Sequence, residues 1–291
     1  MADSRVSISG ALTFAWSLLM ANWRSVWGVL ALTSLAATVY LAGGFADNQD
    51  IYWGGLAALW VVSFMSNGAI YRLAFADRHP GDPEFQPGPS GLQWRKLEWR
   101  LMGAATLLAL FFIIVLLVAL VVISGVIVGI AMNRGTSSAL ATPQMLLTAK
   151  GLAGVLGEDG ALVVLLLAIV MYFALFFAII RLSLVASATA DSGRIAVLRT
   201  WALTRGQFWR IAVSCLLVEL PVLFMSGIVR AAGTASQNAI TVPDHMAPGP
   251  ALICGVVMGV LTGGVVTPLL AGVMAYYYRG LKGPPGPAPI P

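Results

Sequence analysis

The sequence predicts an all-α, polytopic membrane protein with six transmembrane helices arranged as three parallel hairpins, joined by short interfacial helices. The first observation behind this prediction is composition: apolar residues make up 59% of the 291 residues, and charged residues only 10%. A soluble domain carries roughly a quarter charged residues, because the outside of a globule needs polar groups. The chain therefore has more apolar surface than a water-soluble fold can bury.

The second observation is a set of six long apolar runs. Crossing a bilayer takes about 20 apolar residues, and each run is of that order. Lipid offers no partner for backbone N–H and C=O groups, so a run that crosses the bilayer is expected to be helical. The runs are Trp27–Gly44, Ile51–Ala76, Leu101–Met132, Ala161–Ile180, Ile211–Val229 and Ala251–Tyr278.

The third observation is a local pattern that precedes the first, third and fifth runs. Tryptophan and arginine recur together in Trp16–Arg24, Trp94–Arg100 and Trp201–Arg210, which hold six of the nine tryptophans. Tryptophan favours the level of the headgroups, so both generic anchoring and an internal duplication explain the pattern. Short helices in the membrane interface are expected at Ser7–Trp23 and Ser192–Gly206.

The ends of the second, fourth and sixth runs also resemble one another, in Tyr71–Asp77, Arg181–Asp191 and Tyr276–Leu281. Each hairpin enters the membrane and returns, so the units are parallel repeats about an axis along the membrane normal. The inverted repeats common in secondary transporters have a different symmetry, which counts against a transporter.

A single helical membrane domain is expected over residues 1–282, with hairpins at about 7–77, 92–191 and 192–282. Residues 283–291 are rich in proline and glycine and are expected to be disordered. The loop at His79–Gly91 is expected to be irregular, the outer loop at Asn133–Gly160 to hold a short helix at Gln144–Leu156, and Thr234–Pro250 to be a second outer loop.

The basic residues are placed unevenly along the chain. If the six runs alternate, 13 of the 17 Lys and Arg residues fall on one side, and only Arg134, Lys150 and Arg230 on the other, with Arg181 at the end of the fourth run. Cytoplasmic loops carry such an excess, so both termini are expected to be cytoplasmic in a bacterial inner membrane. We interpret the charge as an orienting signal that contacts anionic headgroups, because no nucleic-acid recognition motif accompanies it.

A search for a reaction centre finds none in the sequence. The two histidines, His79 and His245, fall in loops on opposite sides, and no zinc-site, nucleophile-elbow or phosphate-loop motif occurs. No catalytic residue, metal ion or cofactor is therefore expected, and the protein is expected not to be an enzyme.

One ionisable residue, Glu219, lies near the middle of the fifth run, two residues before Pro221. An isolated carboxylate at that depth costs about 2.5 kcal/mol or more, so it needs a partner, water or a proton. Arg181 is the candidate partner, and Pro221 is expected to kink the helix. The sequence leaves a structural role and an ion or substrate site both open for Glu219 and Arg181.

Glycines recur four residues apart in two of the runs. Such a spacing forms a smooth face that lets another helix approach closely, and packing within this protein is favoured over a dimer interface or a gate. The glycines are Gly255, Gly259 and Gly263 in the sixth run, which Pro268 is expected to kink, and Gly125 and Gly129 in the third run, which are the expected partner face.

Two segments resemble a known group of proteins. They are Gly88-Pro89-x-Gly91-Leu92-Gln93-Trp94 with Glu98-Trp99-Arg100, and Arg181-Leu182-Ser183-Leu184 followed by Trp201-x-Leu203-Thr204-Arg205-Gly206-x-Phe208-Trp209-Arg210. These are similar to segments of a diffuse group of uncharacterised bacterial inner-membrane proteins. That group is related to the membrane domain of some glycerophosphodiester phosphodiesterases. The catalytic domain is absent here, so the resemblance implies a helical inner-membrane protein of lipid or envelope biology and no catalytic residue.

The sequence therefore favours an integral inner-membrane protein without a catalytic centre that acts as a scaffold or handles lipid or envelope components. The alternative is a small-solute or ion transporter with a polar site around Glu219 and Arg181. The expected partners are membrane lipids, and either a membrane-protein partner or a second copy of the chain.

Overall fold

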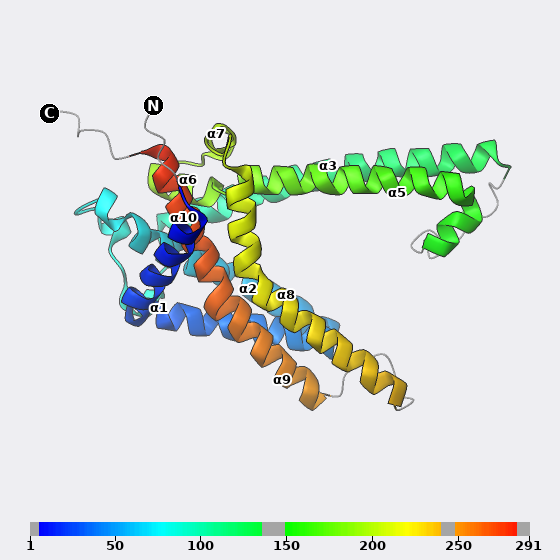
Figure 1. Ribbon diagram of the computed structural model, residues 1–291. Coiled ribbons are helices and arrows are strands. Elements are labelled where there is room, and N and C mark those ends of the chain that lie inside the picture. Colours follow the sequence, from blue (N-terminus) through cyan, green and yellow to red (C-terminus); the bar gives the residue numbers. More distant parts are fainter. Residues whose placement is uncertain (1–5, 136–148, 240–247, 284–291) are drawn as a thin grey trace. The chain divides into compact units, whose positions relative to one another are not determined.

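The computed structural model describes residues 6–135, 149–239 and 248–283, and every regular element in these ranges is a helix (Figure 1). Six of the described helices are long and apolar enough to cross a membrane. The chain is therefore an all-α polytopic membrane protein, and the predicted fold class is confirmed. The spans are Ile8–Gly44, Gln49–Arg78, Pro89–Asn133, Leu156–Ser192, Phe208–Ile228 and Leu252–Lys282.

The chain packs as two compact units. One unit, here called the bundle unit, comprises Met1–Ala104 and Arg181–Pro291, and the other, the hairpin unit, comprises Ala105–Ile180. The prediction of one membrane domain over residues 1–282 remains a prediction. All but Gly283 of the proline-rich tail lies outside the described residues.

The bundle unit begins with a hairpin of α1 (Ile8–Phe45) and α2 (Gln49–Phe75). Ser7 caps α1 by accepting a hydrogen bond from Gly10 N at 3.0 Å, and Asn48 caps α2 in the same way. The segment expected in the interface at Ser7–Trp23 is helical and continues into the span, because residues 11–27 hold neither glycine nor proline. The ribbon of α1 nevertheless changes direction part-way along (Figure 1).

The last span of the bundle unit consists of α9 (Pro248–Gly259), the π-helix η5 (Val260–Val266) and α10 (Thr267–Lys282). Pro268 has no N–H to donate, and the helix widens into the π-helix directly before it. Thr267 Oγ1 donates a hydrogen bond to Thr262 O at 2.8 Å. The structure thus has a widened helical turn just before Pro268, where the sequence predicts a kink.

The glycine face of this span lies against a stripe of small residues on α1. The opposed residues are Gly255 with Ala42, Gly259 with Thr38, and Gly263 with Ser34. A Cβ added at these glycines would lie 2.8, 2.6 and 2.7 Å from Ala42 Cβ, Thr38 N and Ser34 N, respectively, which is too close for any side chain. The helix that packs against this glycine face is therefore α1. Gly125 and Gly129 were expected to form the partner face, but a Cβ added at either of them meets no atom within 4 Å.

Helix α8 (Phe208–Ala239) forms the remaining span of the bundle unit and contains Pro221. Its ribbon bends part-way along (Figure 1). Residues 234–239 of the predicted outer loop are instead helical, because residues 231–239 contain no proline and continue α8. Residues 240–247 of that predicted loop lie outside the described residues.

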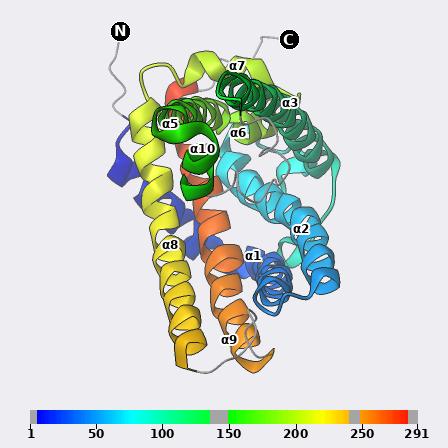
Figure 2. The ribbon, with the colours of Figure 1, turned by 90° about the vertical axis from the view of Figure 1, so that its right-hand side faces the viewer.

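Short elements join the spans at one end of the bundle unit. The loop after α2 contains the 3-10 turns η1 (Ala76–Arg78), η2 (Pro83–Phe85) and η3 (Pro89–Gly91). The fourth span ends in α6 (Val185–Ser192). Between it and the fifth span lies α7 (Val197–Leu203), inside the segment predicted to hold an interfacial helix (Figure 2).

The hairpin unit is built from most of α3 (Lys96–Asn133) and α5 (Ala149–Leu182). Gly157 interrupts α5 with φ 70° and ψ 170°, so Ala149–Leu156 forms a short helical segment ahead of the span. This segment falls within the helix predicted at Gln144–Leu156, of which 144–148 lie outside the described residues. A small core joins the two helices near Gly157 and contains Ala131, Leu156 and Val164.

Candidate functional site

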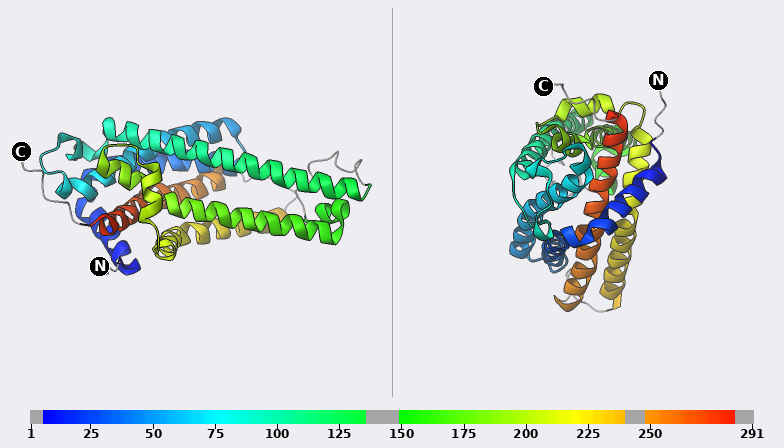
Figure 3. Two further views of the ribbon diagram at one scale, coloured as in Figure 1. Left: turned by 90° about the horizontal axis from the view of Figure 1, so that it is seen from above. Right: turned by 90° about the vertical axis from the view of Figure 1, so that its left-hand side faces the viewer.

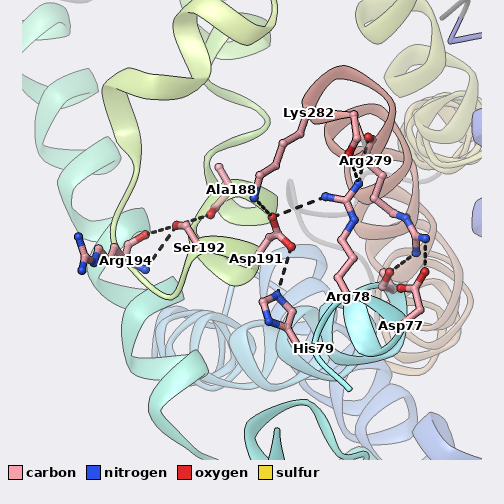
Figure 4. Close-up of polar contacts among 11 residues, drawn as sticks. Asp77, Arg78, His79, Ala188, Asp191, Ser192, Arg194, Arg279 and Lys282 are labelled. Atoms are coloured by element: carbon pink, nitrogen blue, oxygen red, sulfur yellow. Dashed lines mark hydrogen bonds and ion pairs between the residues drawn. The ribbon is translucent and has the colours of Figure 1, made fainter. Parts of the chain in front are cut away.

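The returning ends of the second, fourth and sixth spans meet around one buried carboxylate, Asp191 (Figure 4). The Asp191 side chain is only 2% exposed. Lys282 Nζ lies 2.5 Å from Asp191 Oδ2, His79 Nε2 lies 3.2 Å from Oδ1, and Arg78 Nη1 lies 3.7 Å from Oδ2. We call these four residues the Asp191 cluster. It joins η1, α6 and α10.

A second set of contacts fastens α10 to the end of α2. Arg279 donates hydrogen bonds to Asp77 Oδ2 and to Ala74 O, both at 2.5 Å. Arg78 Nη2 donates to Arg279 O at 3.1 Å and to Gly283 O at 2.9 Å. Figure 4 shows that these pairs and the Asp191 cluster form one continuous network.

Burying a carboxylate is costly unless charged and hydrogen-bonding partners surround it, as they do at Asp191. The network therefore holds three helix ends in a fixed arrangement. The sequence indicated that these ends resemble one another, but not that they contact one another. The sequence signal for such a contact was a complementary charge pattern: the second and fourth spans end with the acidic residues Asp77 and Asp191, and the sixth ends with basic residues.

A buried ion pair, missed by the sequence analysis, lies between α2 and the start of α3. Arg72 Nη2 and Glu98 Oε2 are 2.7 Å apart, and both side chains are 0% exposed. Arg72 Nε also donates to Glu84 O at 2.9 Å, and Glu98 Oε2 accepts from Arg95 N at 2.7 Å. Gly68 is what admits the carboxyl, since a Cβ there would lie 2.9 Å from Glu98 Cδ. The pair therefore links α2 and the start of α3 to the loop between them.

The structure does not bring Glu219 and Arg181 together. Arg181 Nη1 lies 3.4 Å from Thr204 Oγ1, and its guanidinium lies 5.9 Å from the centre of the Trp201 ring. Glu219 is partly exposed beside the buried Val218, and in the described part of the chain no hydrogen bond or ion pair reaches it. The expectation of a Glu219–Arg181 site is corrected accordingly. Arg181 is held by the interfacial α7, whereas Glu219 lies on the flank of the packed face of α8.

Basic side chains without an ion pair gather with exposed tryptophans in the segments that enter the spans. Besides Arg210 and, at the far end of α3, Arg134, five exposed cations have no acidic partner among the described residues, and they are Arg24, Lys96, Arg194, Arg199 and Arg205. The tryptophans are 44–73% exposed, and they are Trp16, Trp23, Trp27, Trp99, Trp201 and Trp209. We call these cations the basic surface. They lie in the same entrance segments as rings that prefer the headgroup level.

Among the described residues no three His, Cys, Asp or Glu side chains lie close enough together to hold a metal ion. His79 belongs to the Asp191 cluster, where its ring also stacks on Phe85 with centroids 4.1 Å apart. His245 lies outside the described residues.

Comparison with known proteins gives no match for this chain among family models, curated proteins or solved structures. The function is therefore argued from the geometry of the bundle unit and from the charges that it exposes.

Proposed function

We propose that this protein is a non-enzymatic, multi-pass protein of a bacterial inner membrane, which scaffolds the membrane or handles lipid by binding anionic headgroups. The observation that carries the proposal is the basic surface, whose five cations have no acidic partner in the described chain. A basic residue next to an anionic membrane surface contributes about 1 kcal/mol of attraction. Zwitterionic headgroups carry a compensating positive charge and therefore give no net attraction of this kind.

The Asp191 cluster and the Arg72–Glu98 pair support this proposal in a different way. Their buried charges are paired with one another inside the protein, whereas the cations of the basic surface are left available to ligands. The resemblance to the membrane domain of glycerophosphodiester phosphodiesterases points in the same direction, toward lipid or envelope biology.

Lipid retention tests the proposal. We would purify the chain and a variant carrying Arg24→Gln, Lys96→Gln, Arg194→Gln, Arg199→Gln and Arg205→Gln, and count the retained lipids by native mass spectrometry. The wild type is expected to retain phosphatidylglycerol in preference to phosphatidylcholine, and the variant to lose that preference. Arg134→Gln, at the far end of α3 from Lys96, is the control. Equal retention of both lipids by the wild type would refute the proposal.

The proposed orientation places both termini in the cytoplasm. It rests on the excess of basic residues on the segments at one end of the bundle unit. In a chain with Cys215→Ala and Cys254→Ala, Ser90→Cys and Gly283→Cys are expected to resist a membrane-impermeant thiol reagent on intact cells, and Thr136→Cys to react. Labelling of Ser90→Cys would overturn the orientation.

The alternative, a small-solute or ion transporter, rests on the carboxyl of Glu219 within α8. It now depends on Glu219 without Arg181, whose guanidinium is directed to α7. Loss of transport in Glu219→Gln, with the fold intact, would favour it over the lipid-binding function.

A further inference from the structure

A groove runs between the first turns of α1 and the first half of α8. Its volume is about 630 Å³, and its walls include Val6, Ile8, Leu12, Arg210 and Leu217. Ligand pockets commonly measure about 300–1,000 Å³ and combine apolar walls with a few polar groups. The right-hand view of Figure 3 shows the start of α1 passing beside α8.

Arg210 presents part of its guanidinium group to this groove. Nη1 donates hydrogen bonds to Val6 O and to Gln207 Oε1, both at 3.2 Å. Nε and Nη2 have no hydrogen-bond partner in the described chain. These two nitrogens form the edge of a guanidinium that binds phosphate through two parallel hydrogen bonds. Arg210 is thus oriented by the protein, while no described residue occupies its phosphate-binding edge.

The backbone at Arg210 is also fixed, from inside the bundle unit. Tyr277 of α10 is 0% exposed, and its hydroxyl donates to Arg210 O at 3.1 Å. The same hydroxyl accepts from Ser214 Oγ at 2.8 Å. A binding side chain is positioned best when its support is itself held by packing and hydrogen bonds. Tyr277 therefore acts as a positioning residue for Arg210.

The apolar wall continues from Arg210 toward the membrane interior. Leu217 lies seven residues further along α8, which is about 10 Å by helical rise. Trp209, which is 73% exposed, places the neighbouring Arg210 at the headgroup level. A cation at headgroup level above an apolar wall matches the order of groups in a phospholipid, with a phosphate followed by acyl chains.

We infer that the groove is a binding site for one anionic glycerophospholipid, with its phosphate on Arg210 and an acyl chain against Leu12 and Leu217. The inference rests on the proposed function and adds to it a single saturable site beside the diffuse basic surface. Charge complementarity selects a phosphate, and the apolar wall selects a lipid over free phosphate.

The test is a titration of the purified full chain with phosphatidylglycerol, followed by native mass spectrometry. Arg210→Gln is expected to weaken the tightest binding step by about tenfold, the effect of losing one charged hydrogen-bonding group. Leu217→Trp fills the groove without changing its charge and is expected to lower the affinity of the same binding step. The matched controls are Leu220→Trp, one turn further along α8, and Arg134→Gln, and neither is expected to alter it.

Two results would overturn the site. One is an unchanged affinity of the tightest binding step in both Arg210→Gln and Leu217→Trp, while the wild type still prefers phosphatidylglycerol over phosphatidylcholine. That result would leave the proposed function standing. The other is complete displacement of the lipid by millimolar inorganic phosphate, which would assign the groove to the free anion. If Arg210→Gln does not fold, Leu217→Trp decides alone.

Discussion

The two units of this chain bury their spans to very different extents. In the bundle unit, 44% of the most apolar 18 residues of the first span is buried, and 39% of those of the second span. The corresponding stretches of the third and fourth spans are only 6% and 11% buried. The third and fourth spans consist mainly of large aliphatic and aromatic residues. The contact between α1 and the glycine face of the last span consists instead of Gly, Ala, Ser and Thr. In a membrane, therefore, large apolar residues indicate contact with lipid, and small residues indicate packing between helices.

The difference also extends to charge. The bundle unit contains a fully buried ion pair and a carboxylate that is 2% exposed, both with partners within hydrogen-bonding distance. The core of the hairpin unit is aliphatic. Helices in the bundle unit are thus held by close backbone approach and by specific polar contacts, and substitutions there are expected to have larger effects than equal substitutions in the hairpin unit.

The largest effect is expected at the buried ion pair. Arg72→Met leaves Glu98 buried without its partner, and removing one member of a buried pair typically costs about 3–5 kcal/mol. Combining it with Glu98→Gln is expected to restore part of that loss. Thermal unfolding in detergent is the measurement, with Arg134→Met in the other unit as the control. A melting temperature of Arg72→Met equal to that of the wild type would contradict the comparison.

A smaller effect is expected where α1 and the last span touch. Gly263→Leu forces a side chain into the backbone of Ser34, and overpacking of this kind costs about 1–3 kcal/mol. Gly125→Leu makes the same change on α3, where an added Cβ meets no atom within 4 Å, and is expected to leave stability within about 0.5 kcal/mol. Equal losses in the two variants, again by thermal unfolding, would show that Gly125 is also packed.

The smallest effect is expected at Glu219, which belongs to the bundle unit but makes no contact of the kind found there. Because no hydrogen bond reaches it in the described chain, both Glu219→Gln and Glu219→Leu are expected to change stability by no more than about 0.5 kcal/mol. A clear loss in Glu219→Leu, without one in Glu219→Gln, would indicate a hydrogen-bonding partner that the isolated chain does not supply.

The sequence predicted the six spans well, because bilayer thickness sets the length of an apolar run and few residues can interrupt it. It also identified the face formed by Gly255, Gly259 and Gly263. The partner of that face could not be read from the sequence, because Ser34, Thr38 and Ala42 form no glycine motif, and only tertiary packing opposes them to it.

The polar sites were harder to predict from sequence. Glu98 stands among basic residues in an entrance segment, so its neighbours suggested an interfacial position rather than a buried partner for Arg72. Glu219 and Arg181 were paired because both lie in apolar runs, but pairing depends on which helix faces meet and at what depth. A hydropathy pattern shows neither which helix faces meet nor at what depth two side chains lie.

The separation along the chain of the contacts around Asp191 has a consequence for biosynthesis. Asp77 and Arg279 are 202 residues apart, and Asp191 and Lys282 are 91 apart. At about 5–20 residues per second, Asp77 is made about 10–40 s before its partner. The ends of the second and fourth spans therefore emerge from the ribosome while Arg279 and Lys282, which fasten these ends, have yet to be synthesised. Their final arrangement is set only when the last span is inserted, which makes the end of α10 the closing step of assembly.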